Sequence, residues 1–370
     1  MTNETKGCKE LIGDVIAQGL CCYCGACSGS CPYLASYKGR IVQMENCTLD
    51  DGQCYQYCPR TPVDMDAVSN HLFGVPYGTD ELGTVQQVCM ARSANDLIRE
   101  KAQYGGTVTT LLSLALDEGL IDSAILTRNA EDKSPVPFVA KSQADILQAA
   151  GSNYMACPVL EAYNRLPEDT NDKLAIVSVP CQALAAAQMR TTPPQHRCNP
   201  DNIAFVVGLF CTWALSSPGF HEFLKASLNL PSVTKFDIPP PPAKRFDAFT
   251  PKGTVSLSLE QIREFTMPTC AYCIDMTAEF SDVSVGSVEG IEGWNTVITR
   301  TDAGAQLLKL AEEKGVLHVD ELPADKMAHL KEASLLKKKR GLKAIVEKTG
   351  DRNNLLYAGV SSSVSEKLLS

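Results

Sequence analysis

The sequence predicts a protein of mixed class, with a small α+β cysteine-rich module followed by an α/β region that has a mostly parallel central sheet. Three apolar runs, at 124–126, 174–179 and 203–210, lack polar alternation, which is typical of strands buried on both faces of a parallel sheet. Helical patterns separate these runs. Residues 1–66, by contrast, hold nine of the 16 cysteines and little apolar periodicity, so this module must be organised around something other than a large apolar core.

The first elements of the α/β region follow a connector at 67–100, which ends in a short helical pattern. From Val108 to Leu120 apolar residues recur at helical spacing, and Gly119 stands near the expected stop. The 174–179 run leads into the helical segment ALAAAQMR. These patterns predict alternating strands and helices.

The last third of the chain begins at four consecutive prolines, 239–242, which indicate a stiff connector. Strands are expected at 282–288 and 294–299, and a helix at 302–314 with Thr301 as its N-cap. These elements would complete the sheet and its helical cover.

We therefore expect a cysteine-rich module at 1–66, an α/β region at 67–238, a further part of that domain at 239–325 and a basic helical tail at 326–370. Within the tail, residues 331–352 carry eight Lys and Arg against three Asp and Glu. Such a segment is expected either to dock an acidic partner or to be a solvated helix face.

Composition and charge exclude several functions. The 34 Lys and Arg against 43 Asp and Glu give a formal net charge of −9, which disfavours nucleic-acid binding as the main role. The longest apolar run, 203–215, is too short to span a bilayer, and the polar first ten residues show no export signal. A cytoplasmic protein is expected, in which bunched cysteines are ligands more often than disulfides.

One cysteine run has the spacing C-x2-C-x2-C-x3-C-P. Its members are Cys21, Cys24, Cys27 and Cys31. This is the bacterial ferredoxin run, in which three thiolates bind one iron–sulfur cluster and the fourth binds a neighbouring cluster. The N-terminal module is therefore predicted to be ferredoxin-like.

A second run, Cys47, Cys54 and Cys58, lacks one of the usual four thiolates, and Asp50 stands where the second cysteine would be expected. Crossed ligation predicts one site from Cys21, Cys24, Cys27 and Cys58, and another from Cys31, Cys47 and Cys54. The latter would hold a three-iron cluster, a four-iron cluster with Asp50 or a spare thiol such as Cys8 or Cys22 as fourth ligand, or no cluster at all. Without motif spacing, Cys8, Cys22, Cys89, Cys157 and Cys198 are individually expected to be bystander thiols.

Cys181 and Cys211 each close a predicted parallel strand, and the carboxyl ends of such strands lie along one edge of a sheet. The C-x-x-C pair Cys270 and Cys273 could join them from a loop and hold a third cluster. Cysteines that end buried strands are about as often plain core thiols, so spacing leaves both interpretations open.

A pair of glycines opens the helix that begins near Val108. At Gly105, Gly106 and Thr107 the backbone amides could approach a phosphate, and the helix dipole would favour its charge, although glycine pairs also serve ordinary turns. No GxGxxG or GxxxxGK[ST] pattern occurs, so neither a nicotinamide Rossmann site nor a P-loop is supported.

Taken together, six segments resemble the coenzyme F420 hydrogenase/dehydrogenase beta-subunit family, and the resemblance extends over roughly residues 15–320. The segments are 22–32, 103–122, 151–163, 177–186, 208–211 and 270–301. The resemblance implies a flavoprotein with FAD and two or three iron–sulfur clusters of the 4Fe–4S type that exchanges a hydride with coenzyme F420. It also implies a cluster at Cys181, Cys211, Cys270 and Cys273. The chain departs from eight-cysteine members at Asp50.

The matching segments further imply which residues lie near the FAD. Gly105, Gly106 and Thr107 would face its pyrophosphate, Ser152, Asn153 and Tyr154 would line the flavin pocket, and Thr277, Ala278, Gly286 and Ser287 would lie nearby. Ordinary alternatives are a turn at 277–278, a bulge at Gly286 and a core position for Tyr154. No side chain is expected to act as a catalytic acid or base.

Electron counting gives the expected pathway. Reduced coenzyme F420 gives up two electrons as a hydride, whereas each cluster accepts one. Electrons would pass from FAD to the Cys181/Cys211/Cys270/Cys273 cluster, through the N-terminal pair, and to a redox partner, or in the reverse direction. The resemblance implies that the partner is ferredoxin or a subunit of a hydrogenase, formate dehydrogenase, heterodisulfide-reductase-like or membrane dehydrogenase complex of anaerobic metabolism, such as methanogenesis. Any membrane association would be peripheral, through that partner.

Two other functions stay open. One is a flavin/iron–sulfur reductase of another organic substrate, similar to the plant chlorophyll-cycle reductase of the family. The other is a pure electron-transfer subunit without a coenzyme site.

Overall fold

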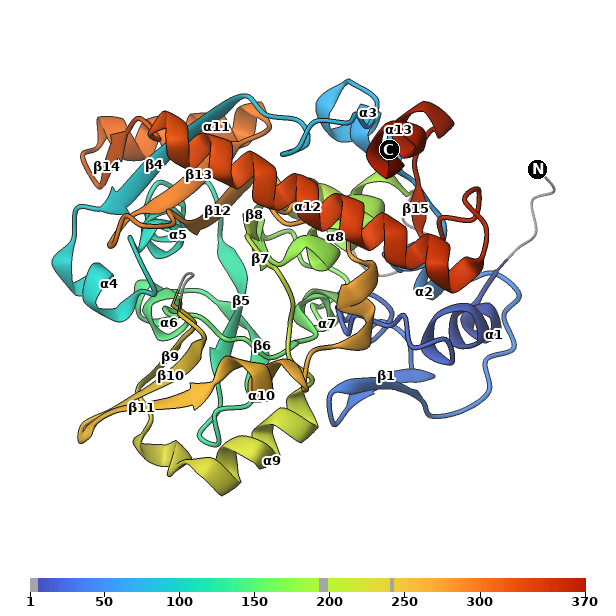
Figure 1. The fold of residues 1–370 in the computed structure, drawn as a ribbon, viewed down its shortest axis with the longest axis horizontal. Helices are drawn as coiled ribbons and strands as arrows, with labels where there is room; N and C mark the ends of the chain where they lie inside the picture. Colours follow the sequence, from blue (N-terminus) through green and yellow to red (C-terminus); the bar gives the residue numbers. More distant parts are fainter. Residues whose placement is uncertain (1–5, 193–198, 240–242) are drawn as a thin grey trace.

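One large central sheet, covered by helices on both faces, forms the body of the protein (Figure 1). The computed structural model describes residues 6–192, 199–239 and 243–370. Within these ranges the sheet has eight strands. Their order across the sheet is β14 (Leu317–Asp320), β4 (Gln87–Ser93), β13 (Asn295–Thr299), β12 (Val283–Ser287), β8 (Ile203–Leu209), β7 (Leu174–Ser178), β5 (Ser123–Asn129) and β6 (Pro135–Ala140).

The middle of this sheet is parallel. Strands β12, β8, β7 and β5 pair in parallel, whereas β14, β4 and β13 on one side and β6 on the other pair antiparallel with their neighbours. Because β4 runs in the same direction as the central four, most strands share one direction. The predicted α/β class with a mostly parallel central sheet is confirmed.

The apolar runs form β5, β7 and β8, as predicted. Successive residues of a strand face opposite sides of the sheet. Leu126 packs with α5 (Thr107–Asp117) and α11 (Asp302–Glu313), whereas its neighbour Ile125 packs with α7 (Val159–Asn164) and α8 (Pro180–Thr191). A strand covered on both faces has no exposed position, which explains why these runs lack polar alternation.

Two predicted helix boundaries are also found. The Thr301 hydroxyl accepts a hydrogen bond from the Gly304 N–H at 3.3 Å and caps α11. After α5, Gly119 adopts a φ of +67°, the left-handed conformation that commonly ends a helix.

The structure differs from the sequence prediction at β4, which lies inside the expected connector 67–100. The short helix predicted in that connector is present as α4 (Asp96–Lys101), but the strand before it was not predicted. Its burial alternates along its length, and it takes its place by pairing with β13 and β14. A strand that depends on such long-range pairing cannot be recognised from a short local sequence such as QVCMARS.

The N-terminal module consists of short elements. These are α1 (Cys8–Leu11), the π-helical turn η1 (Ile12–Ile16), the hairpin β1 (Leu34–Tyr37) and β2 (Arg40–Gln43), α2 (Gln53–Gln56), β3 (Val63–Asp64) and α3 (Met65–Phe73). The first cysteine loop is attached to α7, because the Asn164 amide donates to the carbonyls of Gly25, Ala26 and Ser28 at 3.2, 3.0 and 2.8 Å. The module is thereby fixed to the main domain.

A second, three-stranded sheet lies at the other end of the molecule (Figure 1). It consists of β9 (Lys235–Asp237), β10 (Arg245–Thr250) and β11 (Gly253–Ser258), packed with α9 (Ser217–Ser227) and α10 (Leu259–Arg263). Of the predicted proline connector, residues 240–242 lie outside the described part of the chain. The remaining short elements are α6 (Gln143–Gln148), η2 (Pro200–Asn202), η3 (Leu230–Ser232) and η4 (Pro268–Tyr272).

The C-terminal segment is an integral part of the fold. Helix α12 (Ala324–Thr349) crosses the molecule (Figure 1), and α13 (Ser362–Leu369) follows β15 (Ala358–Gly359), which pairs with β3 of the N-terminal module. A Cβ built on Gly341 would lie 2.6 Å from the Cys273 carbonyl oxygen. Only glycine allows α12 to approach this loop so closely, and Lys337 and Lys338 on the same helix are buried. The solvated helix face considered for this segment is present, since Lys331, Arg340, Lys343 and Lys348 are exposed, whereas other residues of α12 pack into the fold.

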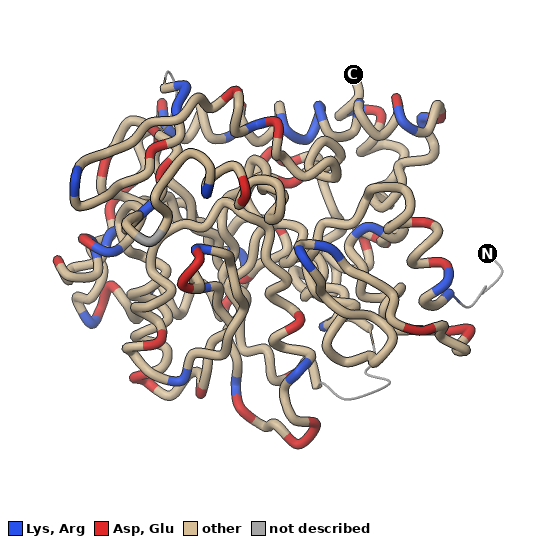
Figure 2. Tube along the Cα trace, turned by 90° about the horizontal axis from the view of Figure 1, so that it is seen from below, with Lys and Arg blue, Asp and Glu red and all other residues tan. Residues whose placement is uncertain are grey.

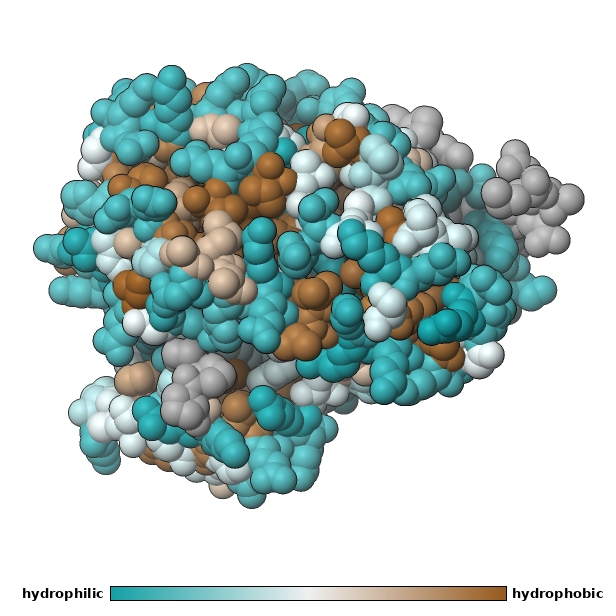
Figure 3. Space-filling model, turned by 45° about the horizontal axis from the view of Figure 1, so that its top comes forward, coloured by the Kyte–Doolittle hydropathy of each residue, from teal (hydrophilic) through white to brown (hydrophobic). Residues whose placement is uncertain are grey.

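The surface carries mixed charges. In Figure 2 basic and acidic residues are interspersed, and the face in Figure 3 is largely hydrophilic, with separate apolar patches. No helix within the described ranges combines the length and apolarity needed to cross a bilayer.

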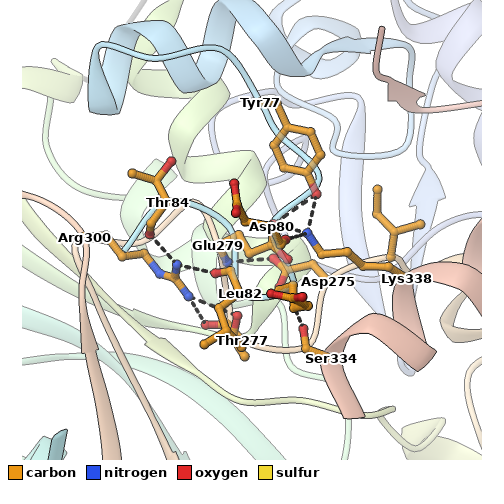
Figure 4. Close-up of polar contacts among 12 residues, drawn as sticks. Tyr77, Asp80, Leu82, Thr84, Asp275, Thr277, Glu279, Arg300, Ser334 and Lys338 are labelled. Carbon is orange, nitrogen blue, oxygen red and sulfur yellow. Dashed lines mark hydrogen bonds and ion pairs between the residues drawn. The ribbon is translucent and has the colours of Figure 1, made fainter. Parts of the chain in front are cut away.

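A buried ionic network attaches α12 to the loop after η4 (Figure 4). The Lys338 ammonium lies 2.9 Å from the Glu279 carboxylate, and both side chains are at most 2% exposed. The Tyr77 hydroxyl donates to the same carboxylate at 3.0 Å. Burial raises the pKa of Glu279, and Lys338 opposes that rise.

Beside this pair, Arg300 connects the 77–84 segment to the loop after η4. Its guanidinium donates to the carbonyls of Leu82 and Thr84 at 2.6 and 2.7 Å and to the Thr277 hydroxyl at 3.0 Å. The two cations thus hold the 275–282 loop between α12 and the 77–84 segment.

Replacing Lys338 by methionine should therefore lower the free energy of unfolding by about 3–5 kcal/mol, because it leaves the Glu279 carboxylate buried without its cation. Urea unfolding followed by circular dichroism measures the loss. Lys343→Met is the control on the same helix, since the Lys343–Glu347 pair is exposed and should contribute less than about 0.5 kcal/mol. Equal stability of the two variants would contradict this assignment.

Candidate functional site

A cavity of about 1350 Å³ lies at the carboxyl ends of β7, β8 and β12. The residues that follow these strands form one wall, and the start of α5, the small sheet and one side of α12 form the others. Ligands of open α/β sheets bind at this edge. The volume exceeds the roughly 300–1,000 Å³ of an ordinary small-molecule pocket, so there is room for more than one ligand.

The start of α5 lines this cavity through Gly106, Thr107 and Thr109. Gly106 has a φ of +75°, and a Cβ there would lie 2.8 Å from Ile98, so glycine is required. The Thr107 N–H donates to the Asn295 side chain at 3.3 Å, and its hydroxyl donates to the Ala91 carbonyl at 3.1 Å. These bonds fix the first turn, whose other N–H groups have no intrahelical partner and lie at the positive end of the helix dipole.

The cavity brings together most of the residues expected near FAD. Gly106, Thr107, Ser152, Asn153, Tyr154, Gly286 and Ser287 line it. Gly105, Thr277 and Ala278 are not among the lining residues. Gly105 packs against the Ala91 carbonyl, Thr277 is bonded to Arg300, and Ala278 is fully buried with a φ of +56°.

Two of the lining residues are held tightly. A Cβ on Gly286 would lie 1.9 Å from the Phe210 ring, so Phe210 lies directly across this glycine. The Tyr154 hydroxyl accepts from the Ile238 N–H at 3.1 Å and donates to Asp237 at 3.4 Å. Burial raises the pKa of Tyr154, which keeps the hydroxyl protonated.

Some polar atoms at this wall have no partner in the protein. In the described part of the chain, the Ser178 hydroxyl and the Gln103 side-chain oxygen are buried without a hydrogen bond, and both residues line the cavity. Buried polar groups are rarely left unpaired. A polar ligand in the cavity would supply hydrogen-bond partners for these two atoms.

The four cysteines predicted for a third cluster also line this cavity. They are Cys181, Cys211, Cys270 and Cys273. Burial, with the charges of Cys270 and Cys273 beside it, raises the pKa of Cys211 to about 12. The Ala214 N–H donates to the Cys270 sulfur at 3.4 Å. The structure thus places in one wall four cysteines from three distant segments.

Two buried cations face this group. Arg60 is 4% exposed, and its guanidinium carbon lies 4.2 Å from the centre of the Tyr357 ring. Among the described residues its Nε has no hydrogen-bond partner, and neither Arg60 nor Lys337 forms an ion pair with a carboxylate in these ranges. Burial alone would lower the pKa of Lys337, but the neighbouring Cys273 and Cys211 raise it. Buried cations require nearby negative charge, which thiolates would provide.

The cysteines of the first predicted N-terminal site are also grouped. Cys21, Cys24, Cys27 and Cys58 line one small cavity together with Cys22. A Cβ on Gly25 would lie 2.6 Å from the Glu161 backbone nitrogen, so glycine lets this loop lie against α7. Burial, with the charge of Cys58 beside it, raises the pKa of Cys27.

Cys22, expected to be a bystander, lies between the first and third groups. It lines both cavities. Hydrogen bonds from the Cys181 and Cys24 thiols hold the pKa of Cys22 well below its ordinary value. The two groups are therefore in contact through this residue.

At the second predicted site, two of the candidate fourth ligands, Asp50 and Cys8, lie in different environments. Asp50 is exposed, whereas Cys8 is buried and lies near Cys31, Cys47 and Cys54. Cys89 and Cys157 are buried thiols outside these groups, and burial raises the pKa of each to about 12. Cys198 lies outside the described residues.

None of these groups has the geometry of a single-ion site. Within the described residues no three His, Cys, Asp or Glu side chains are placed to hold one metal ion. The ligands of a 4Fe–4S cluster bind four different irons, so they surround the cluster and do not converge on one atom.

Sequence reasoning missed Arg60, Lys337, Asn295 and Trp213, all of which line the cavity. Arg60 stands two residues after Cys58, and Asn295 lies within the matched segment 270–301. Their closeness in sequence to a cysteine run and to a family segment could have marked both as candidate site residues. Nothing in the sequence marked Lys337 and Trp213, because their positions at the cavity depend on how α12 and the loop after β8 pack.

Comparison with known proteins agrees with the fold. Two family models described as "Coenzyme F420 hydrogenase/dehydrogenase, beta subunit" match the chain, the N-terminal model over residues 88–164 and the C-terminal model over residues 171–325. The chain is 34% identical over 270 residues to the coenzyme F420 hydrogenase subunit beta of Methanothermobacter thermautotrophicus, and the match covers 71% of this chain and 95% of that protein.

Two further relatives cover most of the chain. It is 27% identical over 323 residues to an F(420)H(2) dehydrogenase subunit of Methanosarcina mazei, covering 84% of this chain and 88% of that protein. A chain of the F420-reducing [NiFe] hydrogenase complex from Methanosarcina barkeri superimposes with a TM-score of 0.64 at 29% identity, covering 72% of this chain and 94% of that one.

Proposed function

The chain belongs to the coenzyme F420 hydrogenase/dehydrogenase beta-subunit family, and from this premise we propose that it is an oxidoreductase subunit that exchanges a hydride with coenzyme F420. It would do so through FAD and pass single electrons through iron–sulfur clusters to or from a partner redox subunit. One observation carries the proposal: the start of α5 and four cysteines form walls of the same cavity.

The residues present fit a flavin dinucleotide. The first turn of α5 offers backbone N–H groups and the positive end of a helix dipole to a pyrophosphate. Ser178 and Gln103 offer buried polar atoms that lack partners within the described chain. When bound, FAD would accept an electron pair from a hydride donor and release electrons one at a time.

The opposite wall fits an anionic coenzyme. Along α12, Lys326, Lys337 and Arg340 line the cavity, and Lys244 and Arg263 line it from the small sheet. These cations outnumber the two acidic lining residues, Glu260 and Glu289. Part of the basic C-terminal segment would thus bind the coenzyme's anionic side chain.

The cysteine groups fit iron–sulfur clusters, which would carry one electron each. Arg60 and Lys337 would balance the charge of the third group, and Cys22 would connect it to the first. Phe210 and Trp213 line the cavity beside Cys211 and would exclude water from the reacting rings. The protein need supply no general base, only orientation and a dry site.

The partner subunit would meet the chain at the second cysteine group. Two large apolar side chains of the segment around Cys47 are unusually exposed: Met44 at 62% and Leu49 at 62%. Met44 and Leu49 flank Cys47 in the sequence. An exposed apolar surface beside the outermost cluster would suit transfer to another protein.

Anaerobic purification followed by flavin and iron analysis tests the proposal. We expect FAD, and about twelve irons if three 4Fe–4S clusters are bound. Reduced F420 should bleach the flavin absorption, whereas NADH should not. If the protein contains only zinc, or contains no flavin, the proposal is refuted. Comparable reduction by NADH would exclude the F420 assignment. Bound FAD that no soluble hydride donor reduces would indicate a pure electron-transfer subunit, and oxidation by another organic substrate would indicate the reductase alternative.

Gly286→Ala should weaken flavin retention roughly tenfold or more, since a methyl group there would force Phe210 into the cavity and overpacking costs about 1–3 kcal/mol. Flavin content after dilution and gel filtration measures the effect. Gly13→Ala is the control, because a Cβ there meets no described neighbour within 4 Å. Equal flavin content in the two variants would count against the placement of the ring near Gly286.

Arg60→Gln should lower the midpoint potential of a cluster, because it removes a buried positive charge that favours the reduced, more negative form. A change of about 1–2 kcal/mol corresponds to ~40–90 mV for one electron. An EPR-monitored redox titration measures the potentials. Arg60→Lys keeps the charge and should stay close to the parent protein. Identical potentials in the glutamine variant would show that Arg60 is only a packing residue.

A further inference from the structure

The second N-terminal cysteine run is packed against the start of the described chain. The Gly52 N–H donates to the Lys6 carbonyl at 3.2 Å. A Cβ built on Gly52 would lie 3.1 Å from the Cys54 sulfur, 3.4 Å from the Gly7 Cα and 3.9 Å from the Cys8 nitrogen. The Cys54 sulfur and the first residue of α1 therefore meet around Gly52, and α1 and α2 lie side by side (Figure 1).

Polar contacts hold α1 in this position. The Lys6 ammonium lies 3.3 Å from the Tyr55 hydroxyl, which donates to Asp14 at 3.0 Å. Glu10 accepts from the Gly7 N–H at 2.9 Å and closes the first turn. Because Tyr55 directly follows Cys54, these bonds fix the start of α1 relative to the second run.

Cys8 belongs to a buried cluster against which Cys47 and Cys54 pack. It is 1% exposed, and Cys47 and Cys31 are among the ionisable groups that interact with it. Cys89 shows what a plain core thiol looks like in this chain, because it lies among apolar side chains of the sheet and its helices.

Asp50 does not share this environment. It is exposed, and its backbone, not its carboxylate, packs against Gly7, where a Cβ would lie 3.5 Å from the Asp50 carbonyl. Burying a carboxylate as a ligand would require this loop to move, whereas Cys8 is already inside.

We propose that Cys8 is the fourth thiolate of the second N-terminal cluster, which would be held by Cys8, Cys31, Cys47 and Cys54. The inference rests on the clusters of the proposed function. It adds the fourth ligand of the second cluster, which neither of the two N-terminal cysteine runs supplies. Cysteine gives this site the four-sulfur set of an ordinary 4Fe–4S cluster, with no oxygen ligand and no permanent three-iron form. The ligand comes from outside both runs, 13 residues before Cys21.

The test compares full-length proteins purified anaerobically: the parent, Cys8→Ala, Cys8→Ser, Asp50→Asn and the buried-thiol control Cys89→Ala. Iron per chain and EPR spectra of the oxidised and reduced proteins are measured. We expect Cys8→Ala to lose one to four irons, with the EPR signal of an oxidised three-iron cluster if one iron is lost. Cys8→Ser should alter the spectrum of a single cluster. Asp50→Asn and Cys89→Ala should match the parent.

The outcomes separate this inference from the proposed function. A parent protein without iron–sulfur clusters would refute the proposed function itself. Clusters that are unchanged in both Cys8 variants, or changed in Asp50→Asn alone, would overturn only the role of Cys8. The signals of the other two clusters report folding, so loss of all three in both Cys8 variants would mark Cys8 as structural and would also overturn the proposal.

Discussion

Buried cations placed beside buried cysteine sulfurs are the feature on which the proposed function most depends. A buried cation is costly unless an anion lies beside it, yet Arg60 and Lys337 are placed next to thiols and form no ion pair with a carboxylate in the described chain. The neighbouring pair Lys338–Glu279 is balanced within the protein. Adjacent residues of one helix differ in this respect: Lys338 is paired with a carboxylate, whereas Lys337 donates to the Cys211 carbonyl and lies beside the Cys211 and Cys273 thiols.

The sheet topology explains how cysteines that are distant in the sequence come to lie beside Arg60 and Lys337. Cys181 and Cys211 follow β7 and β8, whose parallel pairing brings their carboxyl ends to one edge. The loop that carries Cys270 and Cys273 is held by α12, which it meets at Gly341, and by the network around Arg300. Disturbing α12 would therefore affect both the cysteine group and the cation-lined wall of the cavity, because a single helix supports the two.

The sequence allowed the main features of the fold to be predicted where local signals were strong. Buried strands β7 and β8 show as nearly continuous apolar runs, and Thr301 caps a helix through a contact three residues away. The strand β4 and the packing of α12 could not be predicted, since each depends on partners hundreds of residues distant. The same limit applies to the site: spacing identified Cys21 to Cys31, but the position of Cys8 depends on how the chain before it folds back onto Gly52.

If the proposed clusters are bound, the contacts among the three cysteine groups also give their order in electron transfer. Cys22 lines both the large cavity and the small one, and Cys181 and Cys24 bond to it from the third and first groups. Cys27 of the first group in turn lies within electrostatic reach of Cys54 of the second. The first group thus stands between the other two. Since only the second group adjoins the exposed segment 44–50, a cluster there would be the outermost, and its fourth ligand would decide the potential at which the partner exchanges electrons. An exposed aspartate would leave that cluster open to solvent and to loss of one iron, whereas a buried thiolate at Cys8 would seal it from the inner side.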